Sequence, residues 1–253
     1  MRRNAFALAA LLAGAANVAR LDAQTLAQRV DAVRDGVVLM AFQARPGVCG
    51  TSNGSIWTRE SWSNSGSWNH SVCLPGPVRV SLGRADGATI SVRTFVGGTW
   101  RAASSETDLG VVSATEAAHY LAGIAHSIGG RSGSDAVSAA ALSDAPDASP
   151  DLVTIVRDAN APLDARKQAL FWAGNTTLAT RELVNLYDGL APFSLREHYV
   201  FVISQRRDDA AVDKLIDVAR HDADLEIRKR AMYWLGQTQD PKAVKFLRDL
   251  VTR

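Results

Sequence analysis

Four leucines at a nearly constant spacing constrain the fold of this chain more than any other feature. They are Leu152, Leu183, Leu215 and Leu247, which stand 31, 32 and 32 residues apart, and each opens a short apolar pattern. Periods of this length are typical of proteins built from stacked pairs of helices. The spacing therefore predicts an all-α solenoid of about three repeats over residues 131–253, which follows a linker at 129–133.

A second segment recurs with the leucines: RKQALFWAG begins at Arg166, REHYVFVIS at Arg196 and RKRAMYWLG at Arg228. On a helical wheel the apolar positions fall on one stripe. The stripe contains Ala165, Leu195, Ile227, Ala169, Tyr199, Ala231, Trp172, Val202, Trp234, Ala173, Ile203 and Leu235. A single helix cannot hide such a stripe from water, so the copies must stack. In the middle copy Tyr199 replaces alanine and Ser204 replaces glycine, which predicts a local change of packing or curvature.

The last copy resembles HEAT-type repeats, particularly the short HEAT-like repeats of the phycobilisome-lyase kind. The matching residues are Arg228, Ala231, Trp234, Leu235, Gly236, Asp240, Pro241, Lys242, Ala243 and Leu247. The resemblance covers about residues 149–253, and it implies a helical-repeat fold that presents an interaction surface. Families of this kind include lyase subunits, adaptors and scaffolds, and the resemblance carries over no catalytic residue.

Residues 24–130 have the pattern of a small α+β domain, which resembles no family. A helix is expected over residues 25–35 and a buried strand over 37–44. Two alternating segments, 78–82 and 89–96, flank Asp86-Gly87, a tight-turn signal, and they predict a β-hairpin. Ser113 followed by Glu116 predicts the start of a second helix.

The first 23 residues have the pattern of a secretory signal peptide. Arg2 and Arg3 precede an apolar run, and Leu21-Asp22-Ala23 is a cleavage site of the expected kind. The alternative is an amphipathic N-terminus of a cytoplasmic protein. Cleavage would leave 25 basic and 25 acidic side chains, since it removes three arginines and one aspartate from 28 and 26. This balance disfavours nucleic acid as a partner. No other segment is apolar enough to span a membrane, so we expect a protein exported to the periplasm or the medium.

Cys49 and Cys73 are the only cysteines, and in an exported chain such a pair is expected to form a disulfide. The alternative is two free thiols. The bond would close a Trp-, Ser- and Asn-rich loop, residues 50–72, that contains Trp57, Trp62 and Trp68. Tryptophan faces bind sugar rings, and they also pack in cores. The loop therefore supports an alternative function, a glycan- or cell-wall-binding module, beside the simpler hypothesis of a packed loop.

Two short motifs suggest catalytic or metal chemistry, and neither has the required context. Gly50 to Gly54 matches the GxSxG nucleophile motif, but Pro46-Gly47 separates it from the preceding strand and no helix pattern follows. Glu116 and His119, with His126 two turns on, form a single ExxH pattern without the second motif of a di-metal site. We therefore predict no catalytic residue, no cofactor and no metal.

One aromatic side chain recurs in each repeat: Phe171, Phe201 and Tyr233 occupy the same wheel position, opposite the core stripe. Apolar rows of this kind are contact surfaces. Either the first domain or another helix covers the row, or an external partner does. The sequence as a whole predicts an exported, non-enzymatic protein–protein interaction or scaffold module.

Overall fold

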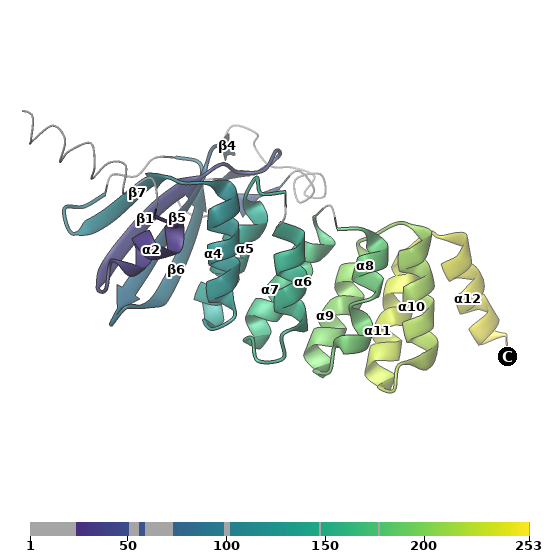
Figure 1. The fold of residues 1–253 in the computed structure, drawn as a ribbon. Helices are drawn as coiled ribbons and strands as arrows, with labels where there is room; N and C mark the ends of the chain where they lie inside the picture. Colours follow the sequence, from purple (N-terminus) through teal and green to yellow (C-terminus); the bar gives the residue numbers. More distant parts are fainter. Residues whose placement is uncertain are drawn as a thin grey trace, which may run out of the picture.

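The fold consists of a β-sheet at one end and a stack of helices that extends from it to the C-terminus (Figure 1). The computed structural model describes residues 24–50, 56–58, 73–98, 102–146, 148–176 and 178–252. The expected signal peptide, residues 1–23, lies outside these ranges. The predicted fold class, an α+β part followed by a HEAT-like solenoid, is confirmed.

The main sheet has four strands in the order β6-β5-β1-β7. The bounds are Gly36–Phe42 for β1, Val78–Ala85 for β5, Ala88–Val96 for β6 and Glu106–Val111 for β7. β5 is antiparallel to β1 and β6, whereas β7 runs parallel to β1. The predicted hairpin is confirmed, because Asp86 and Gly87 at its turn both have positive φ, 52° and 77°, as a type I′ turn requires.

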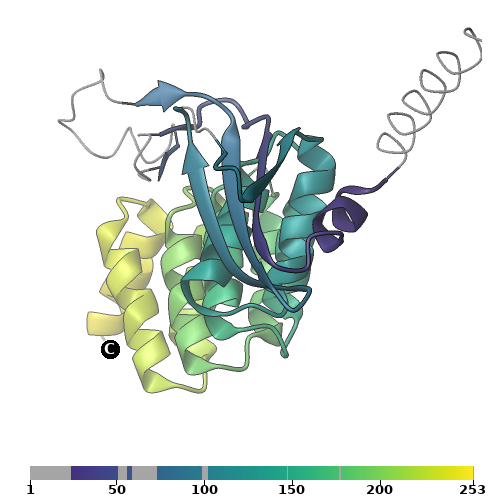
Figure 2. The same cartoon turned by 90° about the vertical axis from the view of Figure 1, so that its left-hand side faces the viewer.

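One face of the sheet packs against helices. Its buried side chains alternate along three strands, and they are Val38, Met40, Phe42, Val78, Val80, Leu82, Val92 and Val96. α5 (Gly130–Leu142) lies across β6 and also along α4 (Ala114–Ala125), and α2 (Leu26–Asp31) lies beside α4 (Figure 2). Ser113 caps α4 by accepting a hydrogen bond from the amide of Glu116, as predicted. The expected domain boundary near residue 130 thus falls between two helices that pack together.

The expected linker at 129–133 is wrong, because this segment forms the first turn of α5. The amide of Gly133 donates to the carbonyl of Gly129, which closes that turn. A Cβ at Gly133 would lie 2.2 Å from the carbonyl oxygen of Ile128. The glycines that indicated a linker therefore allow α5 to begin in close contact with the chain leaving α4.

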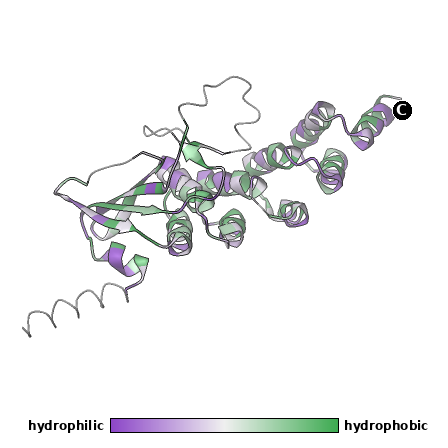
Figure 3. Cartoon of the chain, turned by 90° about the horizontal axis from the view of Figure 1, so that it is seen from above, coloured by the Kyte–Doolittle hydropathy of each residue, from purple (hydrophilic) through white to green (hydrophobic). Residues whose placement is uncertain are grey.

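The remaining helices form a two-layered stack. Their bounds are Ala148–Arg157 for α6, Leu163–Gly174 for α7, Thr180–Val184 for α8, Phe193–Ser204 for α9, Asp209–His221 for α10, Leu225–Gln237 for α11 and Pro241–Val251 for α12. One layer contains α5, α7, α9 and α11, each in contact with the next, and the other contains α4, α6, α8, α10 and α12. Seen from above, the helices lie in two rows (Figure 3).

The predicted core stripe lies between the two layers. Eleven of its twelve residues are buried. The exception is Trp234, which is partly exposed and packs against the edge of the core. The prediction that Trp234 is a core residue is therefore wrong, since this tryptophan is only partly buried. It belongs to the aromatic surface described below.

The middle repeat differs from its neighbours where the sequence indicated. α8 has 5 residues, whereas α6, α10 and α12 in the same layer have 10, 13 and 11. A 3-10 turn, Tyr187–Gly189, follows α8. The ring of Tyr199, which is fully buried, lies 4.9 Å from the ring of Tyr187. A tyrosine replaces alanine here because the shortened helix leaves room for a large side chain.

A second, small sheet joins the first domain to the repeats. It has the order β3-β2-β4, with bounds Ile56–Trp57, Cys49–Gly50 and Leu74–Pro75. The predicted disulfide between Cys49 and Cys73 is present, with 5.4 Å between the Cα atoms. Gly97, with φ of +69°, lies against this sheet, and a Cβ there would approach the carbonyl oxygen of Leu74 to 2.8 Å.

Removing the disulfide with the double change Cys49→Ser and Cys73→Ser is expected to lower the free energy of unfolding by about 3 kcal/mol. The bond joins residues 24 positions apart and restricts the unfolded chain. Among the described residues, β3 pairs only with β2, the strand that contains Cys49. Loss of the disulfide should therefore also make hydrogen exchange at the backbone amides of residues 56–58 faster than in the parent protein. Unfolding followed by circular dichroism, with mass-spectrometric hydrogen exchange, measures both effects. Unchanged stability and unchanged exchange would contradict the expectation.

Candidate functional site

Aromatic side chains line the outer side of the layer formed by α7, α9 and α11. Phe171 and Phe201 are partly buried against the core. The ring of Phe201 lies 5.4 Å from that of Trp234, at an interplanar angle of 55°. Tyr233 lies beyond Trp234, with 5.2 Å between the ring centroids, and is 56% exposed.

The structure corrects the predicted ridge of Phe171, Phe201 and Tyr233. Trp234, rather than Tyr233, continues the row from Phe201, because its ring turns toward the preceding helix. Trp172, at the equivalent position of α7, also turns toward the helix before it in the layer, α5, and donates from Nε1 to Ser138 Oγ over 3.1 Å. That the row contacts a partner stays a prediction.

Three hollows meet along this row, and we call the surface that they form the aromatic groove. The first, of about 590 Å³, contains Phe171 and Phe201. The second, of about 610 Å³, contains Trp234 and lies at the turns after α9 and α11. The third, of about 260 Å³, contains both Phe201 and Trp234. Each hollow shares lining residues with the next, so the groove is continuous across α7, α9 and α11.

The first domain reaches one end of the aromatic groove. Ile56 and Thr58, in and just after β3, line the first hollow together with Phe171. No described residue of the first domain lines the other two hollows. Of the two alternatives for what covers the aromatic row, the first domain therefore lies beside the Phe171 end within the described part of the chain.

Basic side chains outnumber acidic ones in the groove. Its charged lining residues are Lys167, Arg206, Arg207 and Arg230, against Glu197 and Asp240. Both carboxylates are already engaged: Glu197 pairs with Arg230 at 3.1 Å, and Asp240 caps α12 by accepting from the amides of Lys242 and Ala243. The groove consequently has a net positive charge.

The four cations of the groove have different roles. Arg206 donates from Nη2 to the carbonyl oxygens of Leu178, at 3.0 Å, and Thr176, at 3.3 Å, so it ties α9 to the end of α7. Lys167 and Arg207 have no ion pair within the described ranges. These two side chains are therefore available to an anionic group.

A histidine also lies in the third hollow. The ring of His198 is 6.0 Å from that of Phe201. Burial, and then the charge of Lys167, lowers the pKa of His198 below its ordinary value. The imidazole is therefore uncharged at neutral pH. Packing between α9 and its neighbours places His198 beside the aromatic row.

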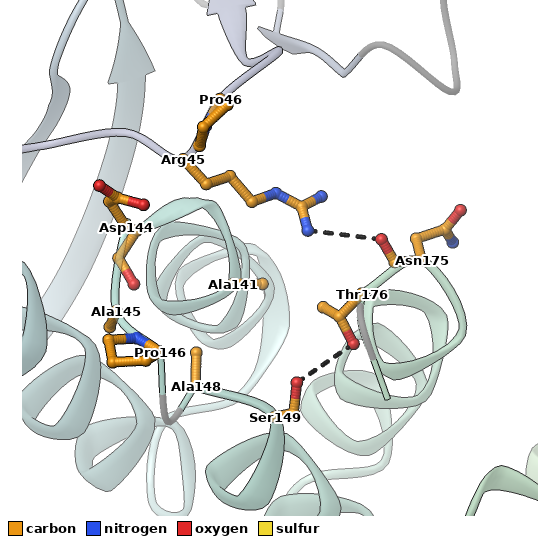
Figure 4. A pocket seen from close by; sticks show the side chains of 11 residues that line it. Arg45, Pro46, Ala141, Asp144, Ala145, Pro146, Ala148, Ser149, Asn175 and Thr176 are labelled. Carbon is orange, nitrogen blue, oxygen red and sulfur yellow. Dashed lines mark hydrogen bonds between the residues drawn. The ribbon is translucent and has the colours of Figure 1, made fainter. Parts of the chain in front are cut away.

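A polar cleft of about 510 Å³ lies behind the first hollow, between the first domain and the ends of α5 and α7 (Figure 4). Arg45 donates from Nη1 to the carbonyl oxygen of Asn175 over 3.4 Å, and its guanidinium lies 5.5 Å from the ring centroid of Trp172. Ser149 donates to Thr176 Oγ1 over 3.3 Å. The contacts of Arg45 join the first domain to the repeats, and the Ser149 bond joins α6 to the end of α7. Both give the cleft a structural role.

The histidines of the ExxH pattern join two helices. His119 on α4 pairs with Asp151 on α6, and His126 pairs with Asp158, with 2.7 Å between Nδ1 and the carboxylate. The hydrogen bond from His126 holds the pKa of Asp158 below its usual value. Among the described residues no three His, Cys, Asp or Glu side chains gather as a metal site would require.

The predicted ligand loop is largely outside the described residues. Trp57 lies in β3, but its side chain is not among those described, and Trp62 and Trp68 fall in the range 59–72. Most of the GxSxG segment, residues 51–54, is outside as well. Glycan binding by this loop stays a prediction.

Comparison with known proteins agrees with the repeat architecture. The sequence model of the HEAT-repeat family matches residues 180–253, which include α8 to α12. The resemblance inferred from the sequence is confirmed for this part, and the first domain matches no family. The chain matches no curated protein and no solved structure. HEAT repeats generally mediate protein–protein interactions. In the part of the chain that the structure describes, no helix is both long and apolar enough to cross a bilayer.

Proposed function

We propose that this protein is an exported, non-enzymatic interaction module whose aromatic groove binds a segment of a protein partner. The observation that carries the proposal is the continuity of the groove, in which Phe171, Phe201 and Trp234 come from three successive helices of one layer. Aromatic and arginine side chains contribute most of the binding energy at protein interfaces. The groove combines both types on a HEAT-like scaffold.

The proposed export rests on two features. The first 23 residues have the charge and apolar pattern of a signal peptide. The disulfide between Cys49 and Cys73 suits an oxidising compartment, since thiols are kept reduced in the cytosol. Mass spectrometry of the protein from its natural host tests this part. A chain that still begins at Met1, or cysteines that react with a thiol reagent before reduction, would exclude export by this route.

The proposed absence of catalysis is supported by the structural partners of the polar side chains. His119 and His126 pair with aspartates of the next repeat, and Asp240 caps a helix. Each of these groups therefore has a structural partner. The groove has aromatic rings and cations at its surface, which suit binding better than proton transfer.

Site-specific photo-crosslinking tests the groove as the binding surface. The probe amino acid p-benzoylphenylalanine would replace Gln205, an exposed residue that lines both the first and the second hollow. The matched control carries it at Lys245, exposed on α12 in the other layer. In the natural host, a covalent adduct is expected from Gln205 and not from Lys245, and Phe201→Ser should abolish it. Equal adducts at both positions, or adducts insensitive to Phe201→Ser, would refute binding in the groove.

A further inference from the structure

We infer that the segment bound in the aromatic groove is an acidic, extended peptide with an apolar side chain at every third position. The inference rests on the proposed function, and it adds the conformation and the charge of the partner. It follows from the spacing of the hollows, from an extended segment that already lines the groove, and from the cations of the groove that have no ion pair among the described residues.

The spacing of the first and second hollows sets the repeat of the ligand. The first hollow lies between the ends of α7 and α9, and the second lies between the ends of α9 and α11. These helices are neighbours in one layer, and packed helices lie about 8–10 Å apart, so the two hollows are about that distance apart. A polyproline II segment rises about 3.1 Å per residue with three residues per turn. Its side chains at every third position therefore lie on one side, about 9 Å apart, in step with the hollows.

Other backbone conformations match the groove less well. In a β-strand, side chains on one face recur every second residue, at about 6.6 Å, and they lose register with the helices after one step. In an α-helix, side chains on one face recur every three or four residues, about 5–6 Å apart, and return to the same line at the seventh residue, about 10.5 Å along the axis. Aromatic grooves also hold polyproline II segments in known modes of peptide recognition. An extended ligand with a three-residue repeat thus fits the spacing of the hollows best.

A segment of the chain itself shows that extended backbone fits at this surface. Ile56 and Thr58 are two residues apart in and just after β3, and both line the first hollow beside Phe171. Side chains two residues apart point to the same side only when the backbone is extended. The second and third hollows continue the groove beyond this segment. A peptide in the groove would lie beside this segment in the first hollow and continue into the second hollow, between α9 and α11.

The charge of the groove selects the sign of the ligand. Lys167 and Arg207 have no ion pair among the described side chains, whereas Glu197 and Asp240 are engaged within the protein. The opposite layer differs: on α10, Asp213 pairs with Lys242, and Asp217 pairs with Lys214 and His221. Complementary charges steer association and exclude partners of the same sign. Carboxylates between the apolar positions of the ligand would reach Lys167 and Arg207.

Fluorescence anisotropy with labelled synthetic peptides tests the inference on the mature protein with its disulfide intact. The probe contains four Leu-Glu-Pro units, about 12 residues, so that leucine falls at every third position. Comparison peptides carry glutamine or lysine in place of glutamate. A fourth places leucines seven residues apart on a helix of alanine and glutamate. The glutamate probe is expected to bind about tenfold more tightly than the glutamine peptide at low salt, and salt should reduce this difference.

Variants assign the effect to the groove. The double variant Lys167→Glu and Arg207→Glu should lose the preference for glutamate but retain the glutamine peptide, whereas Phe201→Ser should weaken both. A control with the same change in charge, Lys245→Glu and Arg248→Glu on α12, should bind like the parent protein. Equal binding of the glutamate and glutamine peptides would overturn the acidic character, and tighter binding of the helical peptide would overturn the extended conformation.

The outcome also separates this inference from the proposed function. If no peptide binds, but photo-crosslinking from Gln205 succeeds and depends on Phe201, the groove binds a partner of another kind and only the inference fails. If both experiments fail, the proposed function fails with it.

Discussion

Replacing Tyr199 with alanine is expected to lower the free energy of unfolding by about 3 to 5 kcal/mol, the range measured for large aromatic residues in cores. Tyr199 is among the largest fully buried side chains of the described structure. It packs against Tyr187, in the 3-10 turn that follows the shortened α8. Alanine would leave a cavity in place of the ring. Urea unfolding of the variant and the parent measures the difference.

The hydroxyl of Tyr199 should behave differently from its ring. Its oxygen is buried without a hydrogen-bond partner among the described residues, and burial raises the pKa of the phenol well above its usual value. Tyr199→Phe removes this unsatisfied group, so it is expected to leave the stability unchanged or to raise it by up to about 1 kcal/mol.

Tyr187 provides the matched control, because its hydroxyl donates to the carboxylate of Asp222. That carboxylate is almost completely buried, and it also pairs with Arg196 at 3.5 Å. Tyr187→Phe should therefore destabilise the protein by about 1.5 to 3 kcal/mol, the usual range for a hydrogen bond to a charged group. If both Tyr-to-Phe changes destabilised the protein equally, Tyr199 would have a partner that the packing does not indicate.

Trp172→Ala is expected to cost about 3 to 5 kcal/mol, but Trp234→Ala only about 1 to 2 kcal/mol, because the two tryptophans differ in burial. Trp172 is 8% exposed, donates to Ser138 and lies under the guanidinium of Arg45. Trp234 packs on Phe201 and otherwise faces the second and third hollows. Chemical unfolding of both variants compares them directly.

The binding of a partner should depend on Trp234 more than on Trp172, which is the reverse of their order in stability. Trp234→Ala removes part of the groove's aromatic floor, so adducts from the probe at Gln205 should decrease although the fold remains. A loss of stability from Trp234→Ala as large as that from Trp172→Ala would show that Trp234 is a core residue and not a groove residue. The sequence alone led to that assignment, because both tryptophans occupy one wheel position.

Local patterns determined most of the secondary structure and the architecture. The spacing of Leu152, Leu183, Leu215 and Leu247 predicted the stack, because each repeat has to bury the same stripe of side chains. Asp86-Gly87 predicted the hairpin, since few residues adopt two successive positive φ angles. The presence of two cysteines predicted the disulfide between Cys49 and Cys73. In these cases the physical cause acts over a few residues, or repeats at a fixed interval, so it is visible in the sequence.

The tertiary structure alone decided which aromatic residues share a surface. Phe171, Phe201 and Tyr233 occupy one wheel position, but Tyr233 is exposed and the two phenylalanines are partly buried. The wheel gives the direction of a side chain from its own helix axis, and neighbouring helices decide what that side chain meets.

Contacts between distant parts of the chain were equally invisible in the sequence. Arg45 reaches Asn175 across 130 residues, and Ile56 lines a hollow on α7 and α9. His126 meets Asp158 because α4 joins the helical stack. No periodicity or motif records such contacts, since they depend on how the small sheet and the first helices pack against the repeats. The position of the groove was therefore determined by packing, whereas the repeats that carry it were determined by the sequence.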